Sequence, residues 1–219
     1  MRTTFKFVLL LLFSLGVSSA MADPQSGEYK APYTTVTPLK GDELTVIEFF
    51  KFSCPVCRSY QPIMNGWVKT LPKQIAFKYV PVYEGTESSA GALKMYWAVD
   101  AIANIEQKSA FMDSAYSLVQ DRNGGDDPKM WRDAVLSTGI RQDAFASSWK
   151  SISGNGKSFV ARQTHYVPTA TPTIVICGKY MLNPDNVMGD QDLFIRLANG
   201  LLSKCLVNSG LANDTGKVR

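Results

Sequence analysis

The sequence predicts an α/β domain in which a small sheet is interrupted by a helical insertion. Three observations support this fold class. Residues 44–82 have the pattern of a strand, a helix and a second strand, residues 85–151 have the pattern of helices, and residues 173–206 have that of a hairpin followed by a helix. A chain of 219 residues is long enough for one domain that carries such an insertion.

The first 22 residues, MRTTFKFVLLLLFSLGVSSAMA, have the layout of a cleaved signal peptide. Arg2 and Lys6 make a basic start, an apolar stretch follows over residues 7–17, and small residues end at Ala22. The apolar stretch is shorter than the ~20 residues that span a bilayer, which disfavours a membrane anchor. We therefore expect export to an oxidising compartment, where cysteines can form disulfides.

The first part of the sheet domain is predicted over residues 23–84. After a polar lead-in, residues 44–50 (LTVIEFF) form a run of β-branched and aromatic residues typical of a buried strand. Residues 55–69 place apolar side chains at helical spacing, with Pro55 suited to the first turn. Residues 75–82 predict a second strand, and the order strand, helix, strand favours a parallel crossover.

The helical insertion is predicted over residues 85–151, and the rest of the sheet domain over residues 152–219. Within the insertion we expect helices at 90–105, 109–120 and 130–138. After it we expect a helix at 158–166, strands at 173–177 and 180–182 joined by a two-residue turn, and an amphipathic helix at 192–206.

The stretch FFKFSCPVCRSYQP places Cys54 and Cys57 between the first strand and the first helix. A thiolate at a helix N-terminus is stabilised by unpaired amides and by the macrodipole, and a cysteine one turn on can close a disulfide with it. A zinc site needs a second close pair of ligands, which Cys177, Cys205 and His165 do not supply. A purely structural disulfide is also disfavoured, because so short a loop restrains the unfolded chain little. The pair is therefore interpreted as a redox centre without metal.

The runs VIEFFKFSCPVCRSYQP and TPTIVICGKYMLNP, with a helical segment between them, resemble the DsbA family of disulfide oxidoreductases. The resemblance covers the chain from about residue 33 to 206 and implies a thioredoxin-like fold with an inserted helical domain. It implies that Cys54 is the nucleophile and Cys57 the buried resolving cysteine. It also implies that Thr171-Pro172 is a cis-proline loop facing the disulfide, which together with Pro55 and Val56 contacts substrate.

Glu48 and Lys78 each place a charge inside an apolar strand, which costs free energy unless the charge is paired or hydrated. They match the acidic and basic residues that the family carries beneath its active site. The resemblance therefore implies that the two move the proton of the Cys57 thiol. The alternative is that one or both face solvent at an edge.

This sequence departs from the best-known members of the family at Val56, where they have histidine. Valine supplies neither a cation nor a hydrogen-bond donor to a neighbouring thiolate. We therefore expect a Cys54 pKa above that of the histidine form, and a less oxidising disulfide.

Cys177 and Cys205 lie outside any paired motif, the first at the end of a strand and the second at the end of the last helix. A structural disulfide that ties this helix to the sheet is the favoured interpretation. Two buried free thiols are the alternative.

The function predicted from these residues is that of a periplasmic oxidoreductase that donates the Cys54–Cys57 disulfide to exported proteins with free thiols. We expect no cofactor, a monomer, and reoxidation by a membrane quinone oxidoreductase of the DsbB type, which the resemblance implies. The 23 basic residues nearly balance the 19 acidic ones, so charge implies no nucleic-acid partner. The alternatives are a disulfide reductase or isomerase of the same fold, and a peptide-binding chaperone with secondary redox activity.

Overall fold

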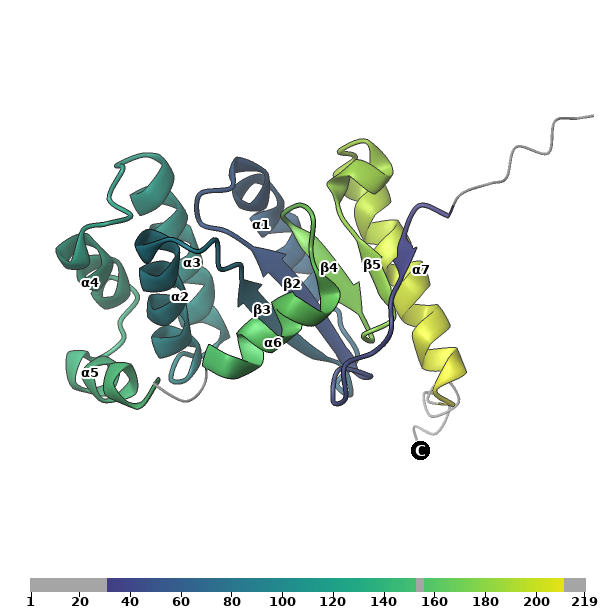
Figure 1. The fold of residues 1–219 in the computed structure, drawn as a ribbon, viewed down its shortest axis with the longest axis horizontal. Helices are drawn as coiled ribbons and strands as arrows, with labels where there is room; N and C mark the ends of the chain where they lie inside the picture. Colours follow the sequence, from purple (N-terminus) through teal and green to yellow (C-terminus); the bar gives the residue numbers. More distant parts are fainter. Residues whose placement is uncertain (1–30, 153–155, 211–219) are drawn as a thin grey trace, which may run out of the picture. The chain divides into compact units, whose positions relative to one another are not determined.

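The computed structural model describes residues 31–152 and 156–210. They form a five-stranded sheet with helices on both faces and a group of four helices next to it (Figure 1). The predicted signal peptide, residues 1–22, lies outside the described residues.

The sheet has the strand order β1-β5-β4-β2-β3. Strands β2 and β3 are parallel, as predicted for a strand-helix-strand unit, and the other neighbouring pairs are antiparallel. The strands are β1 (Thr34–Thr35), β2 (Thr45–Phe50), β3 (Ala76–Pro81), β4 (Thr173–Ile176) and β5 (Tyr180–Leu182).

Both faces of the sheet are covered, so every residue of the central strand β2 is buried. One face packs against α1 (Pro55–Val68) and α7 (Gln191–Asn208), with Val46 in that core. The other face packs against α6 (Gly156–Tyr166), with Ile47 in that core. The alternation along β2 decides which side chain enters which layer.

The helical insertion consists of four helices between β3 and α6. They are α2 (Glu87–Asp100), α3 (Ile105–Gln120), α4 (Pro128–Leu136) and α5 (Gln142–Ser151). Thr86, Asn104 and Asp127 cap the first three through side-chain oxygens that accept backbone N–H groups. An aromatic cluster joins the insertion to the sheet; Phe50, the last residue of β2, and Phe52, in the turn after it, pack there against Tyr116 and Trp131.

The sequence did not predict α5, β1 or a short 3-10 helix at Pro184–Val187. Helix α5 has a mostly polar sequence, QDAFASSWKS, and no side-chain cap at Arg141, so its start and its buried face are weakly marked. Strand β1 has only two residues and is defined by its pairing with β5.

The predicted hairpin is present, but its loop has three residues rather than two. Ile176 pairs with Tyr180, and the intervening Cys177 and Gly178 both have positive φ, so the strand ends one residue earlier than predicted. A side chain at Gly178 would lie 3.0 Å from the backbone of Pro38, so the loop requires glycine there.

Candidate active site

The junction of β2 and α1 places Cys54 at the N-cap of the helix. Cys54 has an extended backbone, Pro55 occupies the first turn, and the Cys54 Sγ accepts the backbone N–H of Cys57 at 3.1 Å. The free amides of a helix start therefore point at this sulfur, as the sequence predicted. Cys54 is 9% exposed and Cys57 is fully buried.

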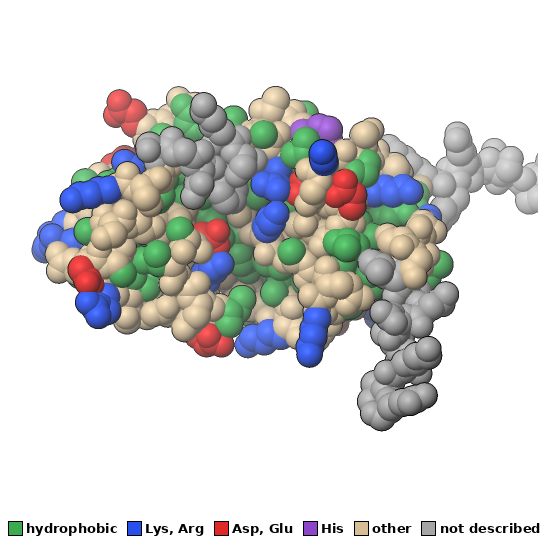
Figure 2. Space-filling model, turned by 90° about the horizontal axis from the view of Figure 1, so that it is seen from below, with side chains coloured by type: hydrophobic (Ala, Val, Ile, Leu, Met, Phe, Trp, Pro, Cys, Tyr) green, Lys and Arg blue, Asp and Glu red, His purple; other side chains and the backbone are tan. Residues whose placement is uncertain are grey.

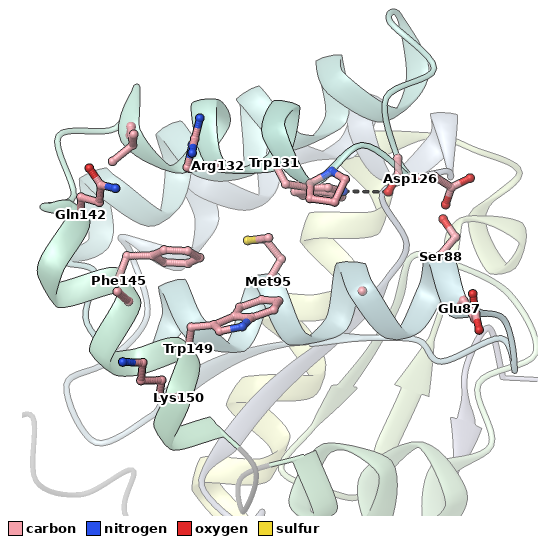
Figure 3. A pocket seen from close by; sticks show the side chains of 15 residues that line it. Glu87, Ser88, Met95, Asp126, Trp131, Arg132, Gln142, Phe145, Trp149 and Lys150 are labelled. Carbon is pink, nitrogen blue, oxygen red and sulfur yellow. Dashed lines mark hydrogen bonds between the residues drawn. The ribbon is translucent and has the colours of Figure 1, made fainter.

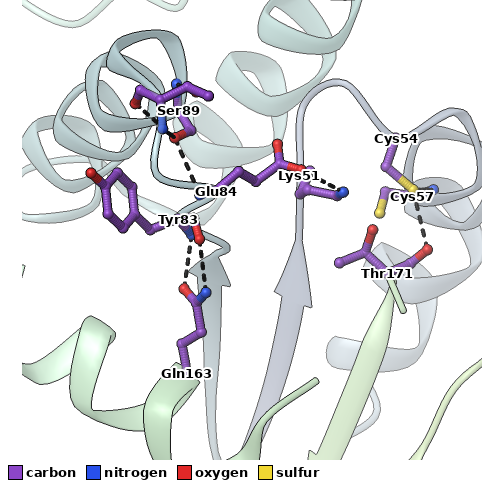
Figure 4. Close-up of polar contacts among 9 residues, drawn as sticks. Lys51, Cys54, Cys57, Tyr83, Glu84, Ser89, Gln163 and Thr171 are labelled. Atoms are coloured by element: carbon purple, nitrogen blue, oxygen red, sulfur yellow. Dashed lines mark hydrogen bonds and ion pairs between the residues drawn. The ribbon is translucent and has the colours of Figure 1, made fainter. Parts of the chain in front are cut away.

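The loop before β4 brings Thr171 to the same sulfur. The Thr171–Pro172 peptide bond is cis, and the Thr171 carbonyl oxygen lies 3.2 Å from the Cys54 Sγ, to which it is joined in Figure 4. Pro172 is buried and Thr171 half-buried. Cys54 and Thr171 are 117 positions apart in the chain and meet in the structure, as the family resemblance implied.

Two thiols of the same type have opposite pKa shifts. The pKa of Cys54 is lowered to about 6, first by a hydrogen bond from the Cys57 thiol and further by Thr171 and by the backbone amides of Cys57 and Val56. Burial raises the pKa of Cys57, and its hydrogen bond to Cys54 raises it further. At neutral pH the pair therefore consists of a Cys54 thiolate and a Cys57 thiol.

Glu48 is fully buried, and neither of its carboxylate oxygens has a hydrogen-bond partner within the described residues. Burial, and then the negative charge of Cys54, raise the pKa of Glu48 to about 8. The carboxyl group is therefore protonated at neutral pH, when the Cys54 thiolate has already formed.

The expectation that Glu48 and Lys78 work together is wrong in its geometry. In the parallel ladder Glu48 pairs with Tyr79, whereas Lys78 pairs with Ile47. Neighbouring residues of a strand point to opposite faces, so Lys78 lies on the face that packs against α6 and Glu48 on the other. Lys78 is half-buried on the edge strand, which fits the alternative that one of the two charges reaches solvent.

The sequence reasoning missed two polar residues at this site. The side-chain amide of Gln120, at the end of α3, donates to the carbonyl oxygens of Phe52 and Cys54 at 2.8 and 3.1 Å. Lys51 forms an ion pair with Glu84 at 2.8 Å. The hydrogen bond to Glu84 raises the Lys51 pKa most, and the charges of both active-site cysteines raise it further. The signal for Lys51 was a cation three residues before the first cysteine.

Figure 4 shows the side chain of Lys51 directed from Glu84 toward the cysteine pair. Val56 is 43% exposed, and Pro55 beside it is exposed as well. An apolar surface therefore borders Cys54 on the helix side.

Cys177 and Cys205 form a disulfide, the pairing that the sequence favoured. It joins the β4–β5 loop to α7 and lies in a different part of the core from Cys54 and Cys57. This bond therefore connects the last helix to the sheet and is separate from the redox pair.

Among the described residues, no group of His, Cys, Asp and Glu side chains is arranged to hold a metal ion. Within the same residues, no helix has the length and apolar character needed to cross a membrane. Basic and acidic side chains are interspersed on the face shown in Figure 2.

No family model matches the chain. Among curated proteins, it is 28% identical over 190 residues to the thiol:disulfide interchange protein DsbA of Burkholderia cepacia, covering 82% of this chain and 87% of the relative. It is 26% identical over 212 residues to DsbA of Pseudomonas syringae pv. tomato, covering 93% of this chain and 96% of the relative.

Solved DsbA structures have the same fold. The crystal structure of Pseudomonas aeruginosa DsbA has a TM-score of 0.71 at 19% identity, covering 82% of this chain and 95% of its own. DsbA from Proteus mirabilis has a TM-score of 0.64 at 18% identity, covering 78% and 94%. The resemblance and the thioredoxin-like fold with a helical insertion are confirmed, and the chain is a DsbA-like thiol:disulfide interchange protein, an oxidoreductase.

Proposed function

We propose that the chain is a periplasmic oxidase that donates a Cys54–Cys57 disulfide to exported proteins with free thiols. The observation that carries the proposal is the placement of the two sulfurs: that of Cys54 lies at the N-cap of α1 and accepts the Cys57 N–H, whereas Cys57 is fully buried. The Cys54 pKa is accordingly lowered to about 6, and that of Cys57 is raised. A stabilised thiolate favours the reduced enzyme, and a disulfide whose reduced form is stabilised is an oxidant. The two sulfur atoms carry the electrons, so the reaction needs no further cofactor.

The reaction begins when a substrate thiolate attacks the Sγ of Cys54. A bond forms between the two sulfurs, the Cys54–Cys57 bond breaks, and its electron pair passes to the Sγ of Cys57. A second substrate thiolate then attacks the substrate sulfur of the mixed disulfide, and Cys54 leaves as a thiolate. The substrate is oxidised by two electrons and the enzyme is reduced by two.

In this scheme Glu48 passes a proton to the Cys57 thiolate, and its carboxylate then regains a proton from solvent, because its raised pKa favours the neutral acid. Cys57 is fully buried and its pKa is raised, so its thiolate must be protonated as it forms. Glu48 is buried, has a pKa of about 8 and faces the same side of the sheet as Phe50 and Tyr79, which belong to the core cluster that contains both cysteines. A neutral carboxyl group there can donate a proton without a buried charge being present beforehand.

The surface around Cys54 is suited to an extended polypeptide. Thr171 contacts the sulfur and is followed by Pro172, while Pro55 and Val56, which follow Cys54 in the chain, are exposed. We assign substrate contact to these four residues. Reoxidation is expected to come from a membrane quinone oxidoreductase of the DsbB type, and the enzyme is expected to act as a monomer.

The in vivo redox state of Cys54 and Cys57 tests this function. Acid trapping and alkylation of the thiols, followed by gel electrophoresis, separates the oxidised from the reduced enzyme. The oxidase is expected to be mostly oxidised at steady state. A mostly reduced pair would contradict the proposal and support a reductase or isomerase.

Cys54→Ser separates the oxidase from a peptide-binding chaperone. The variant is expected to lose the oxidation of a reduced, unfolded protein, because the attacked sulfur is gone. A variant that kept the full activity of the wild type would show that the function does not depend on the thiol.

A further inference from the structure

A cavity of about 600 Å³ lies within the helical insertion, between α2, α4 and α5. Its volume is in the range of ligand sites. Figure 3 shows Met95, Trp131, Phe145 and Trp149 gathered around it. Met95 and Trp131 are buried, whereas Phe145 and Trp149 are half-buried and belong to α5. The ammonium group of Lys94 lies 4.1 Å from the centroid of a Trp149 ring and restrains that side chain.

The polar residues of the cavity separate by charge. Glu87 and Asp126 lie at one end in Figure 3, and Arg132 and Lys150 lie toward the other, near Phe145 and Trp149. Within the described part of the chain, Glu87, Asp126 and Lys150 form no ion pair. A ligand with charges of both signs and an apolar group between them is therefore complementary to the cavity.

The acidic end of the cavity continues toward the redox pair. A smaller cleft of about 120 Å³ is lined by Lys51 and Ser53, the residue before Cys54. This cleft shares Ser88, Gly125 and Trp131 with the larger cavity. The indole N–H of Trp131 donates to the Gly125 carbonyl oxygen at 2.7 Å, which fixes the shared wall. The two hollows therefore adjoin along this wall, and together they extend from Ser53, the chain neighbour of Cys54, into the insertion; we call the pair the groove.

We propose that this groove binds an extended, unfolded stretch of the substrate polypeptide, with an aromatic or large aliphatic side chain in the insertion cavity. The inference rests on the proposed function, because an oxidase meets its substrates before their thiols are buried by folding. A polypeptide carries basic and acidic groups on either side of an apolar residue, whereas an anionic amphiphile has charge of one sign only. The extension of the groove to Ser53 also favours an occupant long enough to reach the neighbouring Cys54.

Filling the cavity tests the proposal. Gly91 lines it from α2, and a side chain added there meets no atom within 4 Å, so Gly91→Phe projects a ring into the groove without displacing the core. Gly200→Phe is the matched control, because Gly200 also lies inside an exposed helix face with free space around it but outside the groove.

The probes are synthetic reduced peptides that contain one cysteine and either tryptophan or alanine at a series of distances from it. The second-order rate constant for reduction of the oxidised enzyme is measured by stopped-flow fluorescence, with dithiothreitol as a thiol too small to reach the cavity. We expect tryptophan at a favoured distance to increase the rate about ten-fold over alanine, as burial of a large apolar side chain allows. Gly91→Phe should remove this gain and leave the rate with dithiothreitol unchanged. Gly200→Phe should keep both the gain and the dithiothreitol rate of the wild type.

Equal rates for the tryptophan and alanine peptides, all of which reduce the wild-type enzyme, would overturn the groove proposal and leave the oxidase function standing. Failure of every peptide to reduce an enzyme that dithiothreitol reduces would count against both. Binding of a long-chain fatty acid that is abolished by Gly91→Phe, with peptide rates unchanged, would assign the cavity to an amphiphile instead.

Discussion

Replacing Glu48 by glutamine should stabilise the reduced protein at neutral pH. The folded protein holds this carboxyl group with a pKa of about 8, against 4.5 for an exposed glutamate, because burial disfavours its charge. Between these two pH values the unfolded chain carries a carboxylate and the folded chain a neutral acid. The contribution of Glu48 to stability is therefore complete below pH 4.5 and is lost as the pH rises to about 8.

The size of the effect follows from the width of this window. Each pH unit inside it lowers the free energy of unfolding by about 1.4 kcal/mol. From pH 4.5 to pH 7 the free energy of unfolding of the wild-type protein therefore falls by about 3 kcal/mol through Glu48 alone, and Glu48→Gln does not show this fall. Glutamine has the same shape and cannot ionise, so other pH effects cancel when the two proteins are compared.

The assay is urea unfolding of both proteins under excess reductant, at a pH below 4.5 and again at pH 7, followed by far-UV circular dichroism. Glu106→Gln, which removes an exposed carboxylate, is the control. A difference between wild type and Glu48→Gln that is the same at both pH values would refute the reasoning. The pKa of Cys54 supplies a second readout. Cys54 ionises near pH 6, where Glu48 is still neutral, so the Cys54 pKa should be the same in the wild type and in Glu48→Gln.

Two further predictions concern the cysteines. Val56→His should lower the Cys54 pKa by about one unit, through a cation beside the thiolate, and raise the reduction potential by about 30 mV. Thiolate absorbance measures the pKa, and equilibration with glutathione measures the potential. An unchanged potential would contradict the argument. Replacing both Cys177 and Cys205 by alanine should lower the free energy of unfolding by about 3 to 4 kcal/mol, as expected for a disulfide between residues 28 apart. Unfolding in urea checks this, and a loss below about 1 kcal/mol would show that the bond does little to restrain the unfolded chain.

The elements that the sequence predicted are those whose signals are local. The β2–α1–β3 unit, the hairpin and α7 each carry an apolar pattern of one clear period. The start of α3 was predicted four residues too late, at 109, because the Asn104 cap was not recognised. Strand β1 and helix α5 lack such signals. The first is defined by its partner β5, and the second has only Phe145 and Trp149, one turn apart, as large apolar side chains. The insertion cavity could not be predicted because its walls come from three helices whose packing no local pattern encodes.

The relation of Glu48 to Lys78 depended on register, which the sequence leaves open. Two charges in adjacent parallel strands share a face in one register and lie on opposite faces after a shift of one residue. The structure pairs Glu48 with Tyr79, so the carboxyl group faces an apolar layer without a cation of that strand. Its raised pKa fits this register, and the role proposed for Glu48 is accordingly that of a neutral acid and not of one half of a charge pair.

The different roles of Cys54 and Cys57 follow from their positions in one helical turn. Three residues of spacing place one sulfur at the N-cap, where an amide donates to it, and the other inside the first turn, where burial is complete. That much is encoded locally, and it is why the sequence alone predicts a stabilised thiolate at Cys54. The extent of the difference is not local, because Thr171 reaches the sulfur of Cys54 from a distant loop. Gln120 of the insertion binds the carbonyl oxygen of the same residue. The sheet domain and the insertion therefore both hold Cys54, the first at its sulfur and the second at its backbone carbonyl.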